Sequence, residues 1–314
     1  MRVFVAGASG VVGRRLLPML REAGHDVTGM TRSEARAEAI RAAGATPAIC
    51  DVFDETATCE AVERSRPDAV VHQLTDLPQD LKPRGLEKAY AANDRIRREG
   101  TRNLVKAAVS AGARRLIAQS LAFAYAPSGP SVVDEEHPLW LDAPAPFGGA
   151  VAAVDELERA VLDPQVEALE GIVLRYGFFY GPRTSYASDG YIAGEVRRRR
   201  FPRVGRGEGV FSFTHVDDAA GATVAGLDRG RPGAYNIVDD DPAPMSEWLP
   251  YYATALGAKP PLRVPKLVAR LVGGEYAVML ATELRGASNA RAKRELAWEP
   301  RHASWRVGFR DALG

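Results

Sequence analysis

The sequence predicts an α/β fold, a doubly wound parallel sheet of the Rossmann type with a second, smaller α/β substrate lobe. Three observations lead to this prediction. Short β-rich runs alternate with helical segments through residues 1–175, the pattern of a parallel sheet covered by helices. The first run, residues 2–6, ends in glycines at three-residue spacing, Gly7, Gly10 and Gly13. Beyond residue 175 the regular alternation stops.

The glycine-rich turn predicts a phosphate-binding site. Gly7 would allow the tight turn out of the strand, Gly10 would let backbone approach a pyrophosphate, and Gly13 would let the next helix pack against the strand. The free N–H groups and the positive dipole at the helix start would face the phosphates. The alternative interpretation is a tight turn between a strand and a helix without a ligand.

The following elements are expected in regular order. Strands are predicted over residues 25–31, 45–50, 67–72, 114–120 and 171–175. Helices are predicted over residues 33–43, 54–65, 86–111 and 147–162, with Ser33 as an N-cap. Because ligands of such sheets bind at the carboxyl ends of the strands, functional side chains are expected there.

The end of the second strand bears on the choice of cofactor. In NAD-binding units an acidic residue at this place holds the ribose 2′-hydroxyl. Here Thr31 occupies the place and Arg32 follows. A cation can pair with a 2′-phosphate, so the sequence favours NADP over NAD. A solvated arginine at the end of a strand is the alternative.

The second lobe is predicted from discontinuous segments. Residues 176–209 are rich in glycine, aromatic residues and arginine, and proline-punctuated helices follow residue 241. Between them, residues 211–215 and 217–227 are typical of a strand and a helix that return to the sheet. We therefore expect a cofactor domain over 1–175 with 211–240, and a substrate lobe over 176–210 and 241–314 that closes over the reactive end of the cofactor.

Composition limits the classes of function. The chain has 314 residues, 46% hydrophobic content, a formal net charge of +1 and two cysteines. A near-neutral chain without an aromatic platform does not predict nucleic-acid binding. The apolar stretch 267–284 is interrupted by Arg270, Glu275 and Glu283, so no membrane span is expected. With no leader before the first strand and no disulfide framework, we expect a cytoplasmic protein.

A set of motifs spreads over nearly the whole chain. They are GASGVVG (7–13), DV (51–52), VVH (70–72), the run from Asn93 through GTRNLV (100–105) to Ala107, LRYGFFYGP (174–182), FTHVDDA (213–219), AYN (234–236), SN (288–289) and LAWEP (296–300). With these motifs the chain resembles the extended short-chain dehydrogenase/reductases, the group of nucleotide-sugar epimerases and dehydratases.

The resemblance implies cofactor contacts at matching positions. The residues expected at the pyrophosphate are Gly7, Ser9, Gly10, Val11, Val12 and Gly13. Arg32 would meet the 2′-phosphate. The residues expected at the adenine are Asp51 and Val52, those at the ribose Gln73 and Leu74, and those near the nicotinamide Tyr176, Gly177 and Phe178. In the family, dimerisation through the helices over 86–111 and 147–162 is common, so a homodimer is possible here.

The chain departs from the resemblance at the catalytic positions. The family uses a Ser or Thr, a Tyr, and a Lys four residues after the Tyr, for the proton that accompanies hydride transfer. The matching positions here are Leu121, Phe147 and Val151. No lysine anywhere in the chain follows a tyrosine by four residues. The usual proton-transfer set is therefore absent.

Other residues are candidates for chemistry or substrate binding. Ser120 lies at a strand end and could bond a substrate oxygen. Tyr125, on the loop that follows, could be the proton donor at a position displaced from that of the family, and Tyr186 of the second lobe is a third candidate. A satisfied strand-end hydroxyl is the alternative for Ser120, and a tyrosine without a role in the chemistry is the alternative for Tyr125. The candidate substrate residues are Arg200 and Arg206, in and after the arginine run 197–200, and His215. A solvated helix end or a structural lobe junction is the alternative for these, and no histidine–carboxylate spacing predicts a metal site.

Two functions remain open from the sequence. The first is an atypical NADP-dependent oxidoreductase or epimerase acting on a small carbonyl or hydroxyl compound, which could be anionic. Ser120, a tyrosine of the second lobe or water would then handle the proton. The second is an NADP-binding sensor, or a non-redox isomerase or lyase built on the same scaffold. The missing catalytic set favours the second, whereas the intact phosphate loop and the substrate lobe favour the first.

Overall fold

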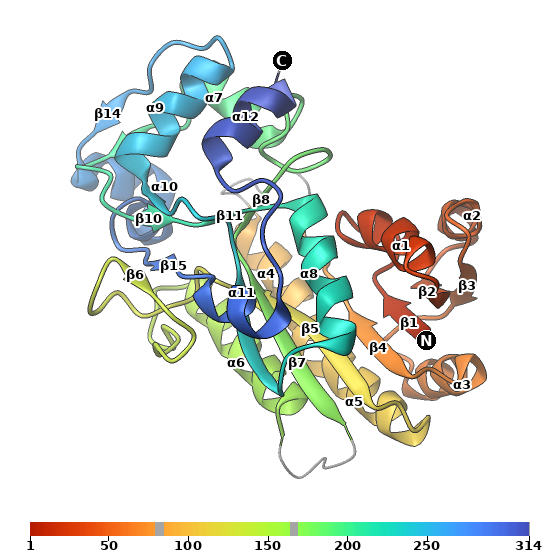
Figure 1. The fold of residues 1–314 in the computed structure, drawn as a ribbon. Coiled ribbons are helices and arrows are strands. Elements are labelled where there is room, and N and C mark those ends of the chain that lie inside the picture. The colour runs from red at the N-terminus through yellow and green to blue at the C-terminus, as the bar shows by residue number, and fades with distance from the viewer. Residues whose placement is uncertain (79–84, 164–168, 314) are drawn as a thin grey trace.

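The computed structural model describes residues 1–78, 85–163 and 169–313. Its centre is a seven-stranded parallel sheet in the order β12-β7-β5-β4-β1-β2-β3 (Figure 1). The strands, in chain order, are β1 (Arg2–Ala6), β2 (Asp26–Thr31), β3 (Thr46–Ile49), β4 (Ala69–His72), β5 (Arg115–Leu121), β7 (Glu170–Tyr176) and β12 (Gly233–Ile237). The predicted α/β doubly wound sheet is therefore confirmed.

Helices cover both faces of the sheet, as the alternation of β1 dictates. Val3 and Val5 pack on one face with α1 (Gly13–Glu22), α2 (Glu34–Ala42) and α8 (Val216–Asp228). Phe4 and Ala6 pack on the other face with α3 (Glu55–Ser65), α5 (Thr101–Ser110) and α6 (Phe147–Val161). Since successive side chains of a strand point to opposite faces, one short strand serves both cores.

The starts of α2 and α3 carry the caps that their sequences indicate. The Ser33 hydroxyl accepts a hydrogen bond from the backbone N–H of Arg36 at 3.3 Å. The Asp54 carboxylate accepts one from Ala57 at 2.9 Å. Each bond satisfies an N–H group that has no partner within the helix, and the predicted N-cap at Ser33 is confirmed.

The helical region expected over 86–111 consists of three continuous pieces. These are α4 (Leu86–Arg95), a π-helical turn η1 (Ile96–Gly100) and α5. Arg97 in the π-helical turn is buried, donates to the carbonyl of Ala150 on α6 at 3.3 Å and pairs with Asp94 at 3.4 Å. Such turns are rare and occur often near functional sites.

The second lobe has its own aromatic core. Its elements are β8 (Phe178–Tyr180), α7 (Tyr191–Arg197), β9 (Arg203–Val204), β10 (Val210–Phe211), β11 (Phe213–His215), β13 (Ala243–Pro244), α9 (Met245–Ala255), β14 (Arg263–Val264), α10 (Lys266–Thr282) and α12 (Trp305–Leu313). Figure 1 shows α7, α9, α10 and α12 gathered at one end of the molecule. Buried Trp248, Trp305 and Phe213 lie in this core.

Two segments pack differently from expectation. The strand predicted over 211–215 does not join the central sheet, because β11 pairs with β8; β12 is the strand that extends the sheet beside β7. In addition, α11 (Ala290–Leu296) contributes Ala292 and Leu296 to the core on the α1 side of the sheet, although the substrate lobe was expected over 241–314. The predicted domain boundaries stay a prediction.

Two smaller features complete the fold. β6 (Val132–Val133) pairs with β15 (Gly286–Ala287) and ties the loop after β5 to the chain after α10. Within α10, Gly274 has φ of 73° and kinks the helix, a conformation that glycine adopts without strain. Among the described residues, none of the helices combines the length and the hydrophobicity needed to cross a bilayer.

Candidate dinucleotide and substrate site

The glycine turn after β1 leaves no room for side chains. Gly7 has φ of +91°, and a Cβ there would lie 2.4 Å from the carbonyl oxygen of Gln73. A Cβ on Gly13 would lie 2.3 Å from the carbonyl oxygen of Gly7. Gly10 donates its N–H to the same Gly7 carbonyl at 3.0 Å. The turn is thus closed by backbone alone, which leaves its rim free for a phosphate group.

A cavity opens over this turn at the carboxyl ends of β1, β2 and β4. Its lining residues are Gly7, Ser9, Gly10, Met30, Thr31, Arg32, Arg36, Cys50, Asp51, Val52, Phe53, Gln73, Leu74, Thr75 and Ile96. The structure therefore brings most of the predicted cofactor residues to one cavity. The ones outside its lining are Val11, Val12, Gly13, Tyr176, Gly177 and Phe178.

The end of β2 presents cations to this cavity. Arg32 is half exposed and lies 3.8 Å from Asp76, while Thr31 is buried. Arg36, in the first turn of α2, lines the same cavity. Sequence reasoning missed Arg36, because Arg32 lies before the N-cap Ser33 and helical spacing therefore does not relate the two arginines.

The wall beside β4 contains an acceptor without a partner. The side-chain amide of Gln73 donates to the Tyr176 hydroxyl at 3.0 Å, but its Oε1 is buried and has no hydrogen bond within the described part of the chain. An unpaired buried acceptor is costly, and a ribose hydroxyl would satisfy it. With the glycine turn, this atom fits a bound dinucleotide.

Tyr176 itself lies in the interior. Its hydroxyl also hydrogen bonds to Thr223 on α8 at 2.9 Å, and burial raises the pKa of Tyr176 to about 12. Gly177 donates its N–H to the Thr214 hydroxyl at 2.9 Å. Phe178 stacks on Phe123 at a ring distance of 4.3 Å. Of the three residues expected near the nicotinamide, Phe178 is the one that is not fully buried.

Apolar side chains occupy the positions of the missing catalytic set. Leu121 is the last residue of β5, and Phe147 and Val151 lie in the first turns of α6. Phe147 and Val151 are buried, with Leu121 and Phe123 packed against them. We call this group the apolar cluster; its buried members are Leu86, Tyr90, Ala124, Trp140, Phe147, Ala150, Val151 and Met279.

Ser120 and Tyr125 lie in a buried polar network that, like the apolar cluster, includes a residue of α6. Glu158 on α6 accepts hydrogen bonds from the Ser120 hydroxyl at 2.5 Å and from the Arg175 guanidinium at 2.9 and 2.6 Å. Arg175 also donates to the Tyr125 hydroxyl at 3.0 Å, and this hydroxyl donates to Asn236 at 2.6 Å.

The network favours a structural role for both hydroxyls. Burial raises the pKa of Tyr125 to about 12, so its proton stays in place at neutral pH. The Ser120 proton is directed to a carboxylate. Their catalytic roles stay predictions, to be weighed against these bonds.

The other candidates lie in the second lobe or at its surface. Tyr186 is buried in the lobe core, with its ring 5.9 Å from that of Trp248 and 5.5 Å from that of Phe213. Arg200 and Arg206 are exposed, and Arg206 pairs with Glu208 at 3.3 Å. The structure does not bring these three residues to the lining of the cavity.

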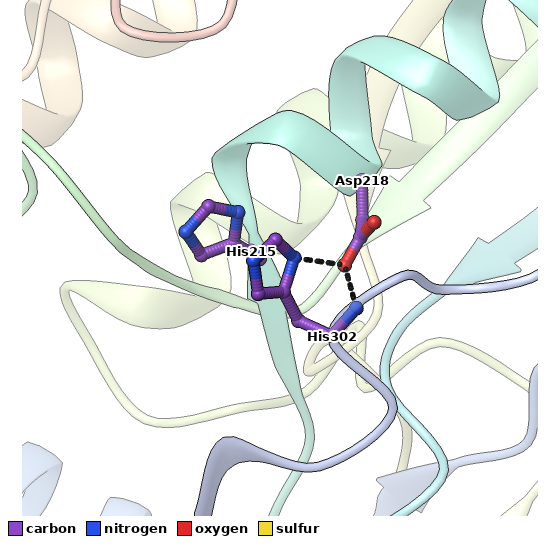
Figure 2. Close-up of side chains that lie close together, drawn as sticks. All are labelled: His215, Asp218 and His302. Atoms are coloured by element: carbon purple, nitrogen blue, oxygen red, sulfur yellow. Dashed lines mark hydrogen bonds and ion pairs between the residues drawn. The ribbon is translucent and has the colours of Figure 1, made fainter. Parts of the chain in front are cut away.

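His215 caps α8 within a cluster of two histidines and a carboxylate. Its Nδ1 accepts from the backbone N–H of Asp217 at 3.2 Å, and its ring stacks on that of His302 at 3.6 Å. Asp218 accepts from the Nδ1 of His302 at 3.1 Å and from its backbone N–H at 3.0 Å (Figure 2). It also accepts from the backbone N–H of Arg301 at 2.8 Å.

The ligand atoms of this cluster, His215, Asp218 and His302, lie within 4.8 Å of one another. Burial and the neighbouring His302 lower the pKa of His215 to about 4, so its ring is neutral. Because its Nδ1 accepts a hydrogen bond, its Nε2 carries the proton. These internal bonds favour a clamp between α8 and residues 301–302, and the substrate role of His215 stays a prediction.

The structure also shows a contact that the sequence did not indicate. The hydroxyls of Tyr90 on α4 and Tyr276 on α10 lie 2.7 Å apart at the edge of the apolar cluster. They are 186 positions apart in the chain, and a single sequence carries no signal that would have paired them.

Comparison with known proteins gives a consistent result. A family model described as the NAD dependent epimerase/dehydratase family matches residues 3–238. A curated relative from a Streptomyces species, 3-diazoavenalumate denitrifying reductase, is 47% identical over 313 residues, which is 98% of this chain and 99% of the relative.

Solved structures show the same fold at low identity. UDP-glucose 4-epimerase of Thermotoga maritima with UDP-glucose has a TM-score of 0.77 at 21% identity, covering 100% of this chain and 97% of that one. The UDP-glucose 4-epimerase of Thermus thermophilus in complex with NAD has a TM-score of 0.76 at 21% identity, covering 100% and 98%.

Proposed function

The chain belongs to the NAD dependent epimerase/dehydratase family, and on that premise we propose that it is an NADPH-dependent reductase that replaces the diazo group of a small aromatic compound by hydrogen. The substrate class comes from the Streptomyces relative, which matches 98% of the chain and is named as a denitrifying reductase of a diazo compound. The stacked rings of Phe123 and Phe178, with the buried Phe147 ring next to Phe123, support an aromatic substrate.

The observation that carries the proposal is the apolar character of the catalytic positions. Reduction of a carbonyl puts a proton on oxygen, and for that step the family pattern has a Tyr and a Lys. Phe147 and Val151 stand at those positions and are buried among apolar side chains. A phenyl ring and an isopropyl group neither donate nor accept a proton, so this part of the site suits a reduction that needs no proton.

Loss of a diazo group is such a reduction. The bound nicotinamide would supply a hydride. In the overall change, the carbon of an arenediazonium group gains a C–H bond from the hydride pair, its C–N bond breaks, and the C–N electron pair leaves with N₂. The charges +1 and −1 cancel, and no oxygen has to be protonated. What remains for the protein is to bind both partners, align them and exclude water.

The residues of this chain would divide these tasks. The turn of Gly7 and Gly10 would hold the pyrophosphate by backbone N–H groups, and Gln73 would hold ribose through its unpaired Oε1. Phe147 and Val151 would keep water from the reacting carbon. The family depends on a nicotinamide dinucleotide, and the choice of NADP rests on Arg32 and Arg36, which would pair with a 2′-phosphate.

A turnover assay tests this function. Purified protein with NADPH would be given 4-diazophenolate, and in parallel a panel of aryl ketones and aldehydes. We expect NADPH oxidation matched by an equal amount of N₂ with the diazo compound, above a protein-free control. Carbonyl reduction without N₂ release would refute the proposal and indicate a carbonyl reductase instead.

A further inference from the structure

The Tyr90–Tyr276 pair joins two parts of the molecule at the apolar cluster. Tyr90 comes from α4 beside the central sheet, and Tyr276 comes from α10 just after its kink at Gly274. Their rings meet edge to face at 6.1 Å and their oxygens lie 2.7 Å apart. The pair thus places hydroxyl groups among mostly apolar side chains.

The pair lies next to the positions that would face a substrate. The Tyr276 ring is 6.0 Å from the Phe147 ring, and Phe147 stands where the family resemblance places the catalytic Tyr. Leu121, at the carboxyl end of β5, packs against the same cluster. Because ligands of open parallel sheets bind at that end of the strands, the two hydroxyls border the space expected for the reacting compound.

The two hydroxyls together have one hydrogen to give. In the pair, one O–H donates to the other oxygen, so the O–H of the second phenol remains available to donate to a ligand. No other hydrogen bond to either hydroxyl exists among the residues that the structure describes. Burial raises the pKa of both Tyr90 and Tyr276, so the pair is a neutral donor at physiological pH and not a base.

A neutral, partly buried O–H suits an anionic oxygen. A hydrogen bond to a charged acceptor is stronger than one between neutral groups. Arg97, buried behind Tyr90, adds a positive field at the phenol that Asp94 partly offsets. An arene that carries a diazonium group and a phenolate oxygen presents such an acceptor both before and after N₂ leaves.

We propose that the paired hydroxyls of Tyr90 and Tyr276 bind the phenolate oxygen of the diazo substrate and orient its ring. This assignment rests on the proposed function for the identity of the substrate. In the balanced reaction, the hydride forms the C–H bond, N₂ leaves with the C–N pair, and the phenolate charge stays on the oxygen that the pair holds. The two tyrosines are binding residues, and they transfer no proton.

Binding of unreactive probes tests the assignment without turnover. With NADP⁺ present, 4-nitrophenolate, 4-nitrobenzoate and 4-nitrotoluene would be titrated by calorimetry at mildly alkaline pH. The proteins would be the wild type, Tyr90→Phe, Tyr276→Phe and the double variant, because either single variant leaves one O–H free. Tyr251→Phe is the matched control, since its hydroxyl donates to the Arg306 carbonyl at 2.9 Å in the second lobe.

We expect the double variant to bind 4-nitrophenolate at least about tenfold more weakly than wild type, the usual effect of losing a hydrogen bond to a charged group. Binding of 4-nitrotoluene should change little, and Tyr251→Phe should match wild type with all probes. Unchanged binding of 4-nitrophenolate in the folded double variant would overturn the assignment. A loss confined to 4-nitrobenzoate would overturn it too, because a carboxylate would then be the oxygen anion bound.

The two proposals fail separately. If wild type releases N₂ from 4-diazophenolate and the double variant keeps wild-type affinity for 4-nitrophenolate, the tyrosine assignment is wrong and the reductase function stands. If wild type releases no N₂ but the double variant loses affinity for 4-nitrophenolate, the pair binds a phenolate of some other reaction.

Discussion

Glu158→Gln tests whether the buried polar network of Ser120, Glu158 and Arg175 is structural. Glu158 and Arg175 have side chains that are each 8% exposed, and the carboxylate accepts three hydrogen bonds, two from Arg175 and one from Ser120. Glutamine removes the charge and leaves the guanidinium buried without a counter-ion. Breaking such a pair from one side costs about 3–5 kcal/mol.

The size of this effect can be converted to a melting shift. Unfolding entropy near 60 °C is about 2.1 cal/mol/K per residue, which gives about 0.7 kcal/mol/K for a chain of 314 residues. The expected loss in Tm is therefore about 5–8 °C, to be measured by calorimetry and by urea unfolding at neutral pH. NADPH affinity should stay within about twofold of wild type at temperatures where both proteins are folded, because no residue of the network lines the cavity over the phosphate turn.

Glu156→Gln on the same helix is the matched control. Glu156 pairs with Arg98 at 2.9 Å, but the side chains of Arg98 and Glu156 are 39% and 48% exposed. Exposed pairs contribute about 0–1 kcal/mol, so this variant should melt within about 2 °C of wild type. If Glu158→Gln and Glu156→Gln melt together, the network does not carry the stability assigned to it.

Two further predictions concern the cofactor and the pH dependence of stability. Arg32→Ala should weaken NADPH binding about 10- to 100-fold through loss of a charge-assisted bond to the 2′-phosphate, and leave NADH binding unchanged by calorimetry. Arg41→Ala on the outer part of α2 is the control, and equal losses for both nucleotides would contradict the NADP assignment. Burial lowers the pKa of His72 from 6.5 to about 4, so the unfolded chain takes up this proton first as pH falls. Because of His72, the free energy of unfolding should therefore fall by about 2 kcal/mol as pH falls from ~6.5 to ~5. In His72→Gln, the free energy of unfolding, measured with urea, should fall by about 2 kcal/mol less over this pH range than in wild type. An equal fall in both proteins would show that His72 titrates normally.

Local sequence signals sufficed for six of the seven strands of the central sheet and for about half of the site. The strand Arg2–Ala6, the glycine turn and the Ser33 cap each depend on a few adjacent residues, so their patterns are readable without tertiary structure. Arg32, Asp51 and Gln73 were predicted at one cavity because they follow strands of one parallel sheet, and the lining contains all three.

Features that depend on long-range packing were missed. The run 211–215 has a strand pattern that says nothing of its partner, and it pairs with β8 instead of the central sheet. Ser120 looked free at a strand end because Glu158, its acceptor, is 38 positions away. Tyr276 lies beyond a kink at Gly274, and only the folded chain brings it to Tyr90.

The most direct measurement traces the hydride. Wild-type protein with NADPH carrying deuterium on the transferable position of the nicotinamide would be mixed with 4-diazophenolate, and the phenol product analysed by mass spectrometry and NMR. We predict one deuterium at the carbon that carried the diazo group and one N₂ for each NADPH oxidised. The account holds that a hydride reduction without proton transfer explains the apolar side chains at Leu121, Phe147 and Val151. A product whose new hydrogen comes from solvent, or one that keeps both nitrogens, would contradict it.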